Sequence, residues 1–278
     1  MYLSNYHSHC TFCDGRSYPE DFVKFAISKG VKSYGFTSHA PLPFETFWTM
    51  KHDDVNEYFQ EITRLKEKYG DRIELYCGLE TDYLNEEHHA GIDYFANLPY
   101  DYLISSIHYI SHPVTGELMG IDGPYSEFEE AVNRVFRGSI EDVIRSFLVQ
   151  SMKMVKTGGF HIVGHVDKIY MNGGKFPGFY DHQALIDELM DKLLLEIQKK
   201  NLILEINTKS LLSQQMTFPN QRYFNRILEL NIPVTINCDS HYPHHVLQGK
   251  AEAVGLLKSL GLTHTMELKK GAWEVHKL

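Results

Sequence analysis

The chain has 278 residues, 43% of them hydrophobic, which is too long for a small disulfide-stapled module but enough for one large α/β barrel or two ordinary domains. Its 36 acidic and 27 basic residues give a formal net charge of −9, and without a basic stripe this argues against binding to nucleic acid. No apolar run approaches the roughly 20 residues that span a bilayer, and the first residues lack a leader pattern, so we expect a cytoplasmic protein without a membrane partner.

The four cysteines lack the spacing of a secreted disulfide framework. Cys77 and Cys238 lie in apolar runs typical of strands, where reduced, buried thiols are expected. Cys10 and Cys13 form a Cys-x-x-Cys pair, which could indicate a redox motif or a zinc knuckle. Neither a second pair nor a thioredoxin-like unit accompanies it, so we do not assign it either role.

The first candidate site lies in the stretch from Tyr2 to Asp14. His7 and His9 are two residues apart, so on an extended strand both imidazoles point to one face. Asp14 adds a carboxylate oxygen to these two nitrogens, a combination that suits zinc, iron or manganese. For this stretch alone, a polar loop with a chance His-x-His pattern is an equal alternative.

Apolar runs that predict buried strands follow along the rest of the chain. They occupy residues 31–37, 73–79, 101–107, 160–164, 202–206 and 232–237. Residues able to bind a metal come at the carboxyl ends of most of these runs: His39, Glu80, His108, His165, Asp239 and His241. Buried histidines bonded to backbone carbonyls are the alternative for any one of them, but the whole set favours a metal site.

Helical patterns separate the apolar runs and complete a series of seven strand-then-helix units. Residues 17–20 match a capping box, and Asp53 or Asp54 is expected to cap the second helix. The polar segment 111–123 predicts a loop, and the two helices that follow it suggest an insertion that shapes a pocket. Helices are expected at residues 19–30, 53–70, 126–136, 139–156, 181–197 and 246–258, with a final strand or hairpin at 265–278.

Seven such units in series predict parallel strands that close into a barrel. Right-handed crossovers place every strand's carboxyl end at the same mouth, where the candidate ligands would meet. No linker or composition shift marks a boundary, so residues 1–278 are expected to form a single domain.

Several spaced motifs occur in a fixed order along nearly the whole chain. They are His7-Ser8-His9, Thr37-Ser38-His39, Gly78-Leu79-Glu80, Ser106-Ile107-His108, Gly164-His165-Val166-Asp167, Glu205-Ile206-Asn207-Thr208 and Asp239-Ser240-His241. This set resembles the polymerase and histidinol phosphatase (PHP) superfamily, and within it the histidinol-phosphate phosphatases. The resemblance implies a distorted seven-stranded (β/α)7 TIM-like barrel with a trinuclear metal site at its carboxyl-terminal mouth.

The resemblance also implies which residues bind three divalent zinc, iron or manganese ions. The implied assignment gives the first ion His7, His9, Glu80 and Asp239, the second His108, His165 and a bridging Glu80, and the third Asp14, His39 and His241.

Two positions depart from the usual pattern of the family. Asn5 stands where many members carry Asp, and Asp14 stands where some relatives place His.

The resemblance further places phosphate-binding cations after the fifth and sixth strands. Lys209 occupies the later position and Lys168 lies near the earlier one, with Arg16 and Lys175 as further candidates. A lysine provides a point charge without the bidentate fork of arginine. An ordinary solvated loop residue is the alternative for each lysine.

Phosphate chemistry is consistent with the charges of this site. Three divalent ions would outweigh the carboxylates of Asp14, Glu80 and Asp239 and attract a phosphate dianion to an acidic protein. A water shared between metals would attack phosphorus, and Asp14 or His241 could organise protonation of the leaving alkoxide.

The resemblance implies the hydrolysis of L-histidinol phosphate, a small phosphate monoester, in histidine biosynthesis. The alternatives are a phosphatase for another small monoester or for phosphotyrosine, a PHP-type nuclease, and a metal-binding scaffold without catalysis. The charge and the missing basic groove argue against the nuclease. The complete ligand set argues against the scaffold. The sequence leaves the oligomeric state open.

Overall fold

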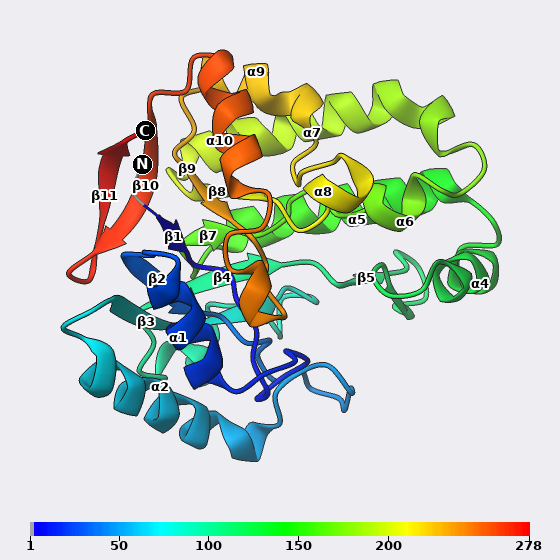
Figure 1. The fold of residues 1–278 in the computed structure, drawn as a ribbon. Helices are drawn as coiled ribbons and strands as arrows, with labels where there is room; N and C mark the ends of the chain where they lie inside the picture. The colour runs from blue at the N-terminus through cyan, green and yellow to red at the C-terminus, as the bar shows by residue number, and fades with distance from the viewer. Residues whose placement is uncertain (1–2) are drawn as a thin grey trace.

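Seven parallel strands form the centre of the protein in a computed structural model that describes residues 3–278 (Figure 1). Tyr2, the first residue of the 2–14 stretch, lies outside the described residues. The strands are neighbours in the order β1-β2-β3-β4-β7-β8-β9, which confirms the predicted barrel. Their bounds are β1 Ser4–Asn5, β2 Ser33–Phe36, β3 Glu74–Asp82, β4 Tyr102–Ser106, β7 Ile162–Val163, β8 Ile203–Asn207 and β9 Val234–Asn237.

The barrel closes between β9 and β1 through an irregular seam. Ser8 and Ser240 form a single parallel bridge beyond the ends of these two strands. Within the seam, the backbone N–H of Tyr6 donates to the side-chain Oδ1 of Asn237 at 2.9 Å. A side-chain amide thus replaces a backbone acceptor where β1 is only two residues long. The regular hydrogen bonding between strands is interrupted at this seam, which makes the barrel a distorted one.

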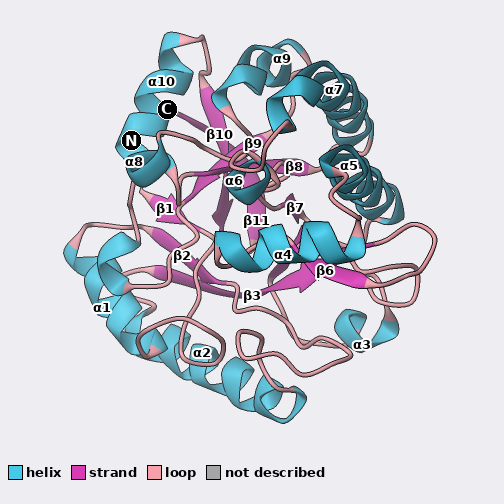
Figure 2. Cartoon of the chain, turned by 90° about the vertical axis from the view of Figure 1, so that its right-hand side faces the viewer, coloured by secondary structure: helices cyan, strands magenta, loops and turns pink. Residues whose placement is uncertain are grey.

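Helices surround the barrel and bury one face against it (Figure 2). In α2, for example, Tyr58, Ile62 and Leu65 recur at helical spacing and are fully buried. None of the helices within residues 3–278 combines the length and the apolar character needed to cross a membrane. The bounds are α1 Pro19–Ser28, α2 Val55–Tyr69, α3 Asp93–Ala96, α4 Tyr125–Val135, α5 Ile140–Thr157, α6 Tyr170–Gly173, α7 Gln183–Lys199, α8 Leu211–Gln214, α9 Phe224–Glu229 and α10 Lys250–Ser259.

Both predicted helix caps are wrong. Tyr18, with extended backbone, takes the N-cap position of α1, which leaves Ser17 one residue too early to cap the helix. A 3-10 turn precedes α2, so Asp54 is already in a helical conformation and its side chain makes no capping bond. An N-cap side chain reaches the first free N–H groups from extended backbone, and Asp54 lacks that geometry.

Two further segments differ from the prediction for reasons that the structure shows. The segment 111–123 contains a strand, because β5 (Tyr109–Ser111) pairs with β6 (Leu118–Gly120) in an antiparallel hairpin around the buried pair Ile110 and Met119. Three-residue strands have too little alternation to be recognised from sequence. Helix α10 begins at Lys250, later than the predicted residue 246, since Gly249 has a φ of 68° and interrupts the helical backbone.

The predicted carboxyl-terminal hairpin is confirmed and closes the amino-terminal end of the barrel. Strands β10 (His264–Lys269) and β11 (Ala272–Lys277) pair antiparallel on the side of the molecule opposite α4 (Figure 1). The ring of Trp273 lies 5.1 Å from that of Tyr6 and 5.8 Å from that of Tyr102, both of which are fully buried. The open mouth is therefore at the carboxyl ends of the strands.

Candidate metal centre

All nine predicted metal ligands meet at this mouth, although they are spread over 235 positions of sequence between His7 and His241. The structure groups them into sets whose ligand atoms lie within 4.8 Å of one another. The sets are His9, Asp14, His39 and His241; His7, His165 and Asp239; His7, His9 and Glu80; and His39, Glu80 and His108.

Glu80 lies at the centre of the cluster, and its side chain is fully buried. Its Oε2 is 3.2 Å from His7 Nε2 and 2.9 Å from His39 Nδ1. Its Oε1 is 2.8 Å from His165 Nε2 and 3.7 Å from His108 Nε2. The two oxygens therefore face different histidines, which is the geometry that a bridging carboxylate requires.

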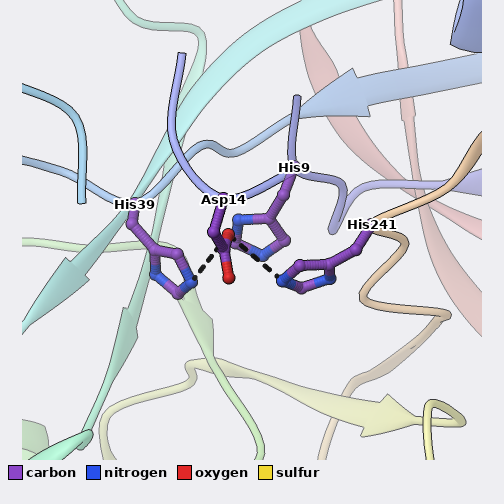
Figure 3. A group of neighbouring side chains, drawn as sticks. All are labelled: His9, Asp14, His39 and His241. Atoms are coloured by element: carbon purple, nitrogen blue, oxygen red, sulfur yellow. Dashed lines mark ion pairs between the residues drawn. The ribbon is translucent and has the colours of Figure 1, made fainter. Parts of the chain in front are cut away.

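Asp14 lies among His9, His39 and His241 (Figure 3). Its Oδ1 lies 3.3 Å from His241 Nε2 and 3.8 Å from His39 Nε2, and its side chain is 26% exposed. The ring of His9 is 4.2 Å from that of His39 and 4.3 Å from that of His241. The resemblance assigns His9 to the same ion as His7, but in the structure His9 also lies next to Asp14, His39 and His241.

Six buried ligand atoms of the cluster have no hydrogen-bond partner within residues 3–278. They are Nε2 of His7, His9 and His108, Nδ1 of His39, Oδ1 of Asp14 and Oε2 of Glu80. Each unsatisfied buried polar atom costs about 1–3 kcal/mol, so six of them facing one another need a common partner. Six imidazoles and three carboxylates suit divalent zinc, iron or manganese, and the cluster fits bound divalent metal ions.

Two further carboxylates orient the histidines, and the sequence analysis did not assign them. Glu205 Oε1 lies 2.7 Å from His7 Nδ1, and both oxygens of Asp82 lie 3.1 Å from His108 Nδ1. Each pair leaves the Nε2 atom to face the cluster, as is usual around protein metal sites. Asp82 follows Glu80 by two residues on the same strand, a spacing that could have indicated it. These carboxylates also reduce the positive charge expected for the loaded site.

Asn5 does not contact the imidazole of His7. Its Nδ2 donates to the backbone oxygen of His7 at 3.2 Å, and its Oδ1 accepts from the backbone N–H of Cys238 at 2.9 Å. Asn5 therefore belongs to the barrel seam, while Glu205 provides the carboxylate behind His7.

The local charges keep the cluster carboxylates ionised. Burial by itself would raise the pKa of Glu80, but the imidazoles of His7, His39 and His108 outweigh burial and hold that pKa well below its usual value. Burial likewise opposes ionisation of Asp239, yet Lys209 and His7 lower its pKa well below the usual value. Both carboxylates are thus available to cations.

The four candidate phosphate-binding residues differ in their positions. Lys175 donates from Nζ to Asn172 Oδ1 at 3.3 Å. Lys209 is beside the cluster, with Nζ 3.1 Å from Asp239 Oδ1 and a side chain that is 38% exposed. Lys168 is buried, and its Nζ is 2.6 Å from Asp122 Oδ2, so it is not a solvated loop residue. Arg16 is exposed, and its guanidinium forms no ion pair or hydrogen bond within residues 3–278; only its backbone N–H reaches the cluster region, by donating to His241 O at 2.8 Å.

The Cys-x-x-Cys pair lies directly behind the cluster as two free thiols. Cys13 Sγ is 3.5 Å from His9 Nδ1, and Cys10 Sγ is 3.2 Å from Ser38 Oγ. Burial raises the pKa of Cys10 to about 11, so this thiol stays neutral at physiological pH.

The parallel barrel and its nine candidate ligands define a β/α barrel with the residues of a metal site at its mouth. The PHP domain family matches residues 5–209, and the chain belongs to this family. A Schizosaccharomyces pombe protein named "Probable histidinol-phosphatase" is 27% identical in an alignment 284 residues long. The alignment covers 95% of this chain and 89% of the relative. The histidinol-phosphatase of Bacillus subtilis is 27% identical over 260 residues, which cover 84% and 92% of the two chains.

The fold is also that of a solved relative. The structure of histidinol phosphate phosphatase from Lactococcus lactis, complexed with zinc, L-histidinol and phosphate, has a TM-score of 0.76 to this chain. The match covers 98% of each chain at 21% sequence identity. The shared architecture therefore extends over the whole barrel and the carboxyl-terminal hairpin.

Proposed function

We propose that this chain is a metal-dependent phosphomonoester hydrolase that converts L-histidinol phosphate and water to L-histidinol and phosphate, a reaction of histidine biosynthesis. The observation that carries the proposal is the set of buried nitrogen and oxygen atoms that face one another at the barrel mouth beside Lys209 and accept or donate no hydrogen bond among residues 3–278. The relatives named histidinol-phosphatase support the choice of substrate.

In this proposal the whole chain acts as one catalytic unit with three divalent ions of zinc, iron or manganese. Nine ligands exceed what one ion of four to six coordination takes up. The first ion is assigned to His7, His9, Glu80 and Asp239, the second to Glu80, His108 and His165, and the third to Asp14, His39 and His241.

The chain's own residues position the substrate and move protons. Lys209 and Lys168 attract the phosphate dianion by charge-assisted hydrogen bonds. Bound divalent ions would lower the pKa of water and neutralise charge on the phosphoryl oxygens. Asp14 or His241, whose Oδ1 and Nε2 atoms lie 3.3 Å apart, would orient a water that gives the leaving alkoxide its proton. Glu80 maintains the spacing of the histidines on its two sides.

Phosphate release from three compounds tests this function. L-Histidinol phosphate, p-nitrophenyl phosphate and a short oligonucleotide are offered side by side to metal-supplemented protein. We expect the highest kcat/KM with L-histidinol phosphate and no cleavage of the oligonucleotide, since the net charge of −9 disfavours a polyanion. Preference for p-nitrophenyl phosphate would favour another monoester or phosphotyrosine, and oligonucleotide cleavage would favour a nuclease.

Lys209→Ala should lower kcat/KM for L-histidinol phosphate by roughly tenfold while the metal content stays unchanged. A hydrogen bond to a charged group is worth about 1.5–3 kcal/mol, and the partial exposure of Lys209 puts its effect at the lower end. Lys209→Arg should retain or exceed wild-type activity, because its fork binds two phosphate oxygens. Steady-state kinetics with elemental analysis checks this, and an alanine variant within about twofold of wild type would exclude Lys209 from phosphate binding.

A further inference from the structure

A cavity of about 350 Å³ opens directly beside the metal cluster and has His39 and His108 in its lining. Cavities of this size are typical of small-molecule sites. One wall comes from the loop between β2 and α2, and the other from the β5–β6 hairpin and α4, which crosses the front of the barrel in Figure 2. The lining residues that matter here are Trp48, Tyr109, Asp122 and Glu127.

The first wall is aromatic and touches the cluster. The ring of Trp48 lies 4.6 Å from that of His39 and 5.2 Å from that of His108. It also lies 6.0 Å from the ring of Tyr109, at an interplanar angle of 23°. An organic group that extends from a phosphate at the metals would therefore meet the indole of Trp48.

The opposite wall carries the carboxylates of Asp122 and Glu127, which differ in their partners. Asp122 is held by the buried Lys168 at 2.6 Å. Glu127, in the first turn of α4, is exposed, and its carboxylate forms no hydrogen bond or ion pair within residues 3–278. Glu127 is therefore the negative charge on this wall that is available to a cationic ligand.

We propose that this cavity binds the organic part of the substrate, with Trp48 contacting the imidazole ring and Glu127 pairing with the primary ammonium group. This inference rests on the proposed function, because L-histidinol phosphate carries both groups. An indole face attracts cationic and heteroaromatic rings, and a carboxylate forms charge-assisted hydrogen bonds with an ammonium group. The insertion that contains α4 thereby selects the substrate, while the cluster binds its phosphate.

Glu127→Gln tests the acidic wall. We expect KM for L-histidinol phosphate to rise about five- to tenfold with kcat unchanged, since the pair contributes to ground-state and transition-state binding alike. The kcat/KM for p-nitrophenyl phosphate, which has no ammonium group, should stay within about twofold. Glu130→Gln is the matched control, because Glu130 is exposed on the same helix but outside the cavity lining, and it should leave both substrates unaffected.

The fluorescence of Trp48 gives an independent readout of binding. Saturating L-histidinol should change the emission of wild-type protein, and Trp48→Phe should abolish that change although Trp273 is retained. Equal KM values for the Glu127→Gln and Glu130→Gln variants, with good turnover of L-histidinol phosphate by wild type, would overturn the cavity assignment alone. A wild type that hydrolyses p-nitrophenyl phosphate but not L-histidinol phosphate would overturn the proposed function and this inference with it.

Discussion

Glu80→Gln is expected to lower kcat/KM for L-histidinol phosphate by about 10³-fold or more and to reduce the amount of bound metal. Glu80 faces five histidines through its two oxygens, so its replacement removes the charge that would hold two ions together. Metal ions supply several kcal/mol of transition-state stabilisation, and each 1.4 kcal/mol or so corresponds to tenfold in rate. Steady-state kinetics and elemental analysis of the same preparation measure both effects.

The control for this variant is Glu74→Gln, at the opposite end of the same strand. Glu74 accepts a hydrogen bond from the hydroxyl of Tyr76 and lies away from the cluster, so activity and metal content should stay near wild type. If Glu80→Gln retained full metal content and near-normal turnover, Glu80 would be a buried structural residue and the assignment of metal ligands would be wrong.

Glu205→Gln should weaken metal affinity by about 10–100-fold and lower the free energy of unfolding by about 1–3 kcal/mol. The carboxylate behind His7 keeps the imidazole oriented, and loss of such a partner has effects of this size on metal affinity. Glu205 also accepts hydrogen bonds from the backbone N–H of His165 at 2.9 Å and from the side chain of Asn237 at 3.1 Å. A glutamine amide cannot accept all of them, so buried donors lose partners.

The matched control is Glu267→Gln, because Glu267 is also a buried carboxylate but lies at the closed end of the barrel, where it accepts a hydrogen bond from Tyr6 at 3.0 Å. This variant should lose stability without losing metal affinity. Isothermal titration with zinc and urea unfolding separate the two effects. Equal zinc affinity in both variants would show that Glu205 acts only on stability.

The clustering of the candidate ligand histidines could be predicted because each follows an apolar run whose pattern already indicates a parallel strand. Once the strands are parallel, His39, His108 and His165 must come out at one mouth, whatever the details of the helices. The carboxyl-terminal hairpin was recognisable for a similar reason, since Met266, Leu268, Trp273 and Val275 alternate with polar residues.

The supporting interactions depend on distances between strands, which sequence patterns do not contain. Glu205 is two strands from His7 around the barrel, and Asp122 pairs with Lys168 across 46 positions of sequence that include α4, α5 and β7. The failed caps at Ser17 and Asp54 have a local cause, because the backbone conformation one residue away decides whether a side chain can reach the helix end.

The central claim is that a multinuclear metal cluster at the barrel mouth hydrolyses L-histidinol phosphate. The most direct test is to remove metals with a chelator and to add back zinc or manganese in known amounts while phosphate release is measured. We predict no activity without metal and a rise that levels off at about three bound ions per chain. Full activity at a single bound ion, or phosphate release that survives complete metal removal, would contradict this account.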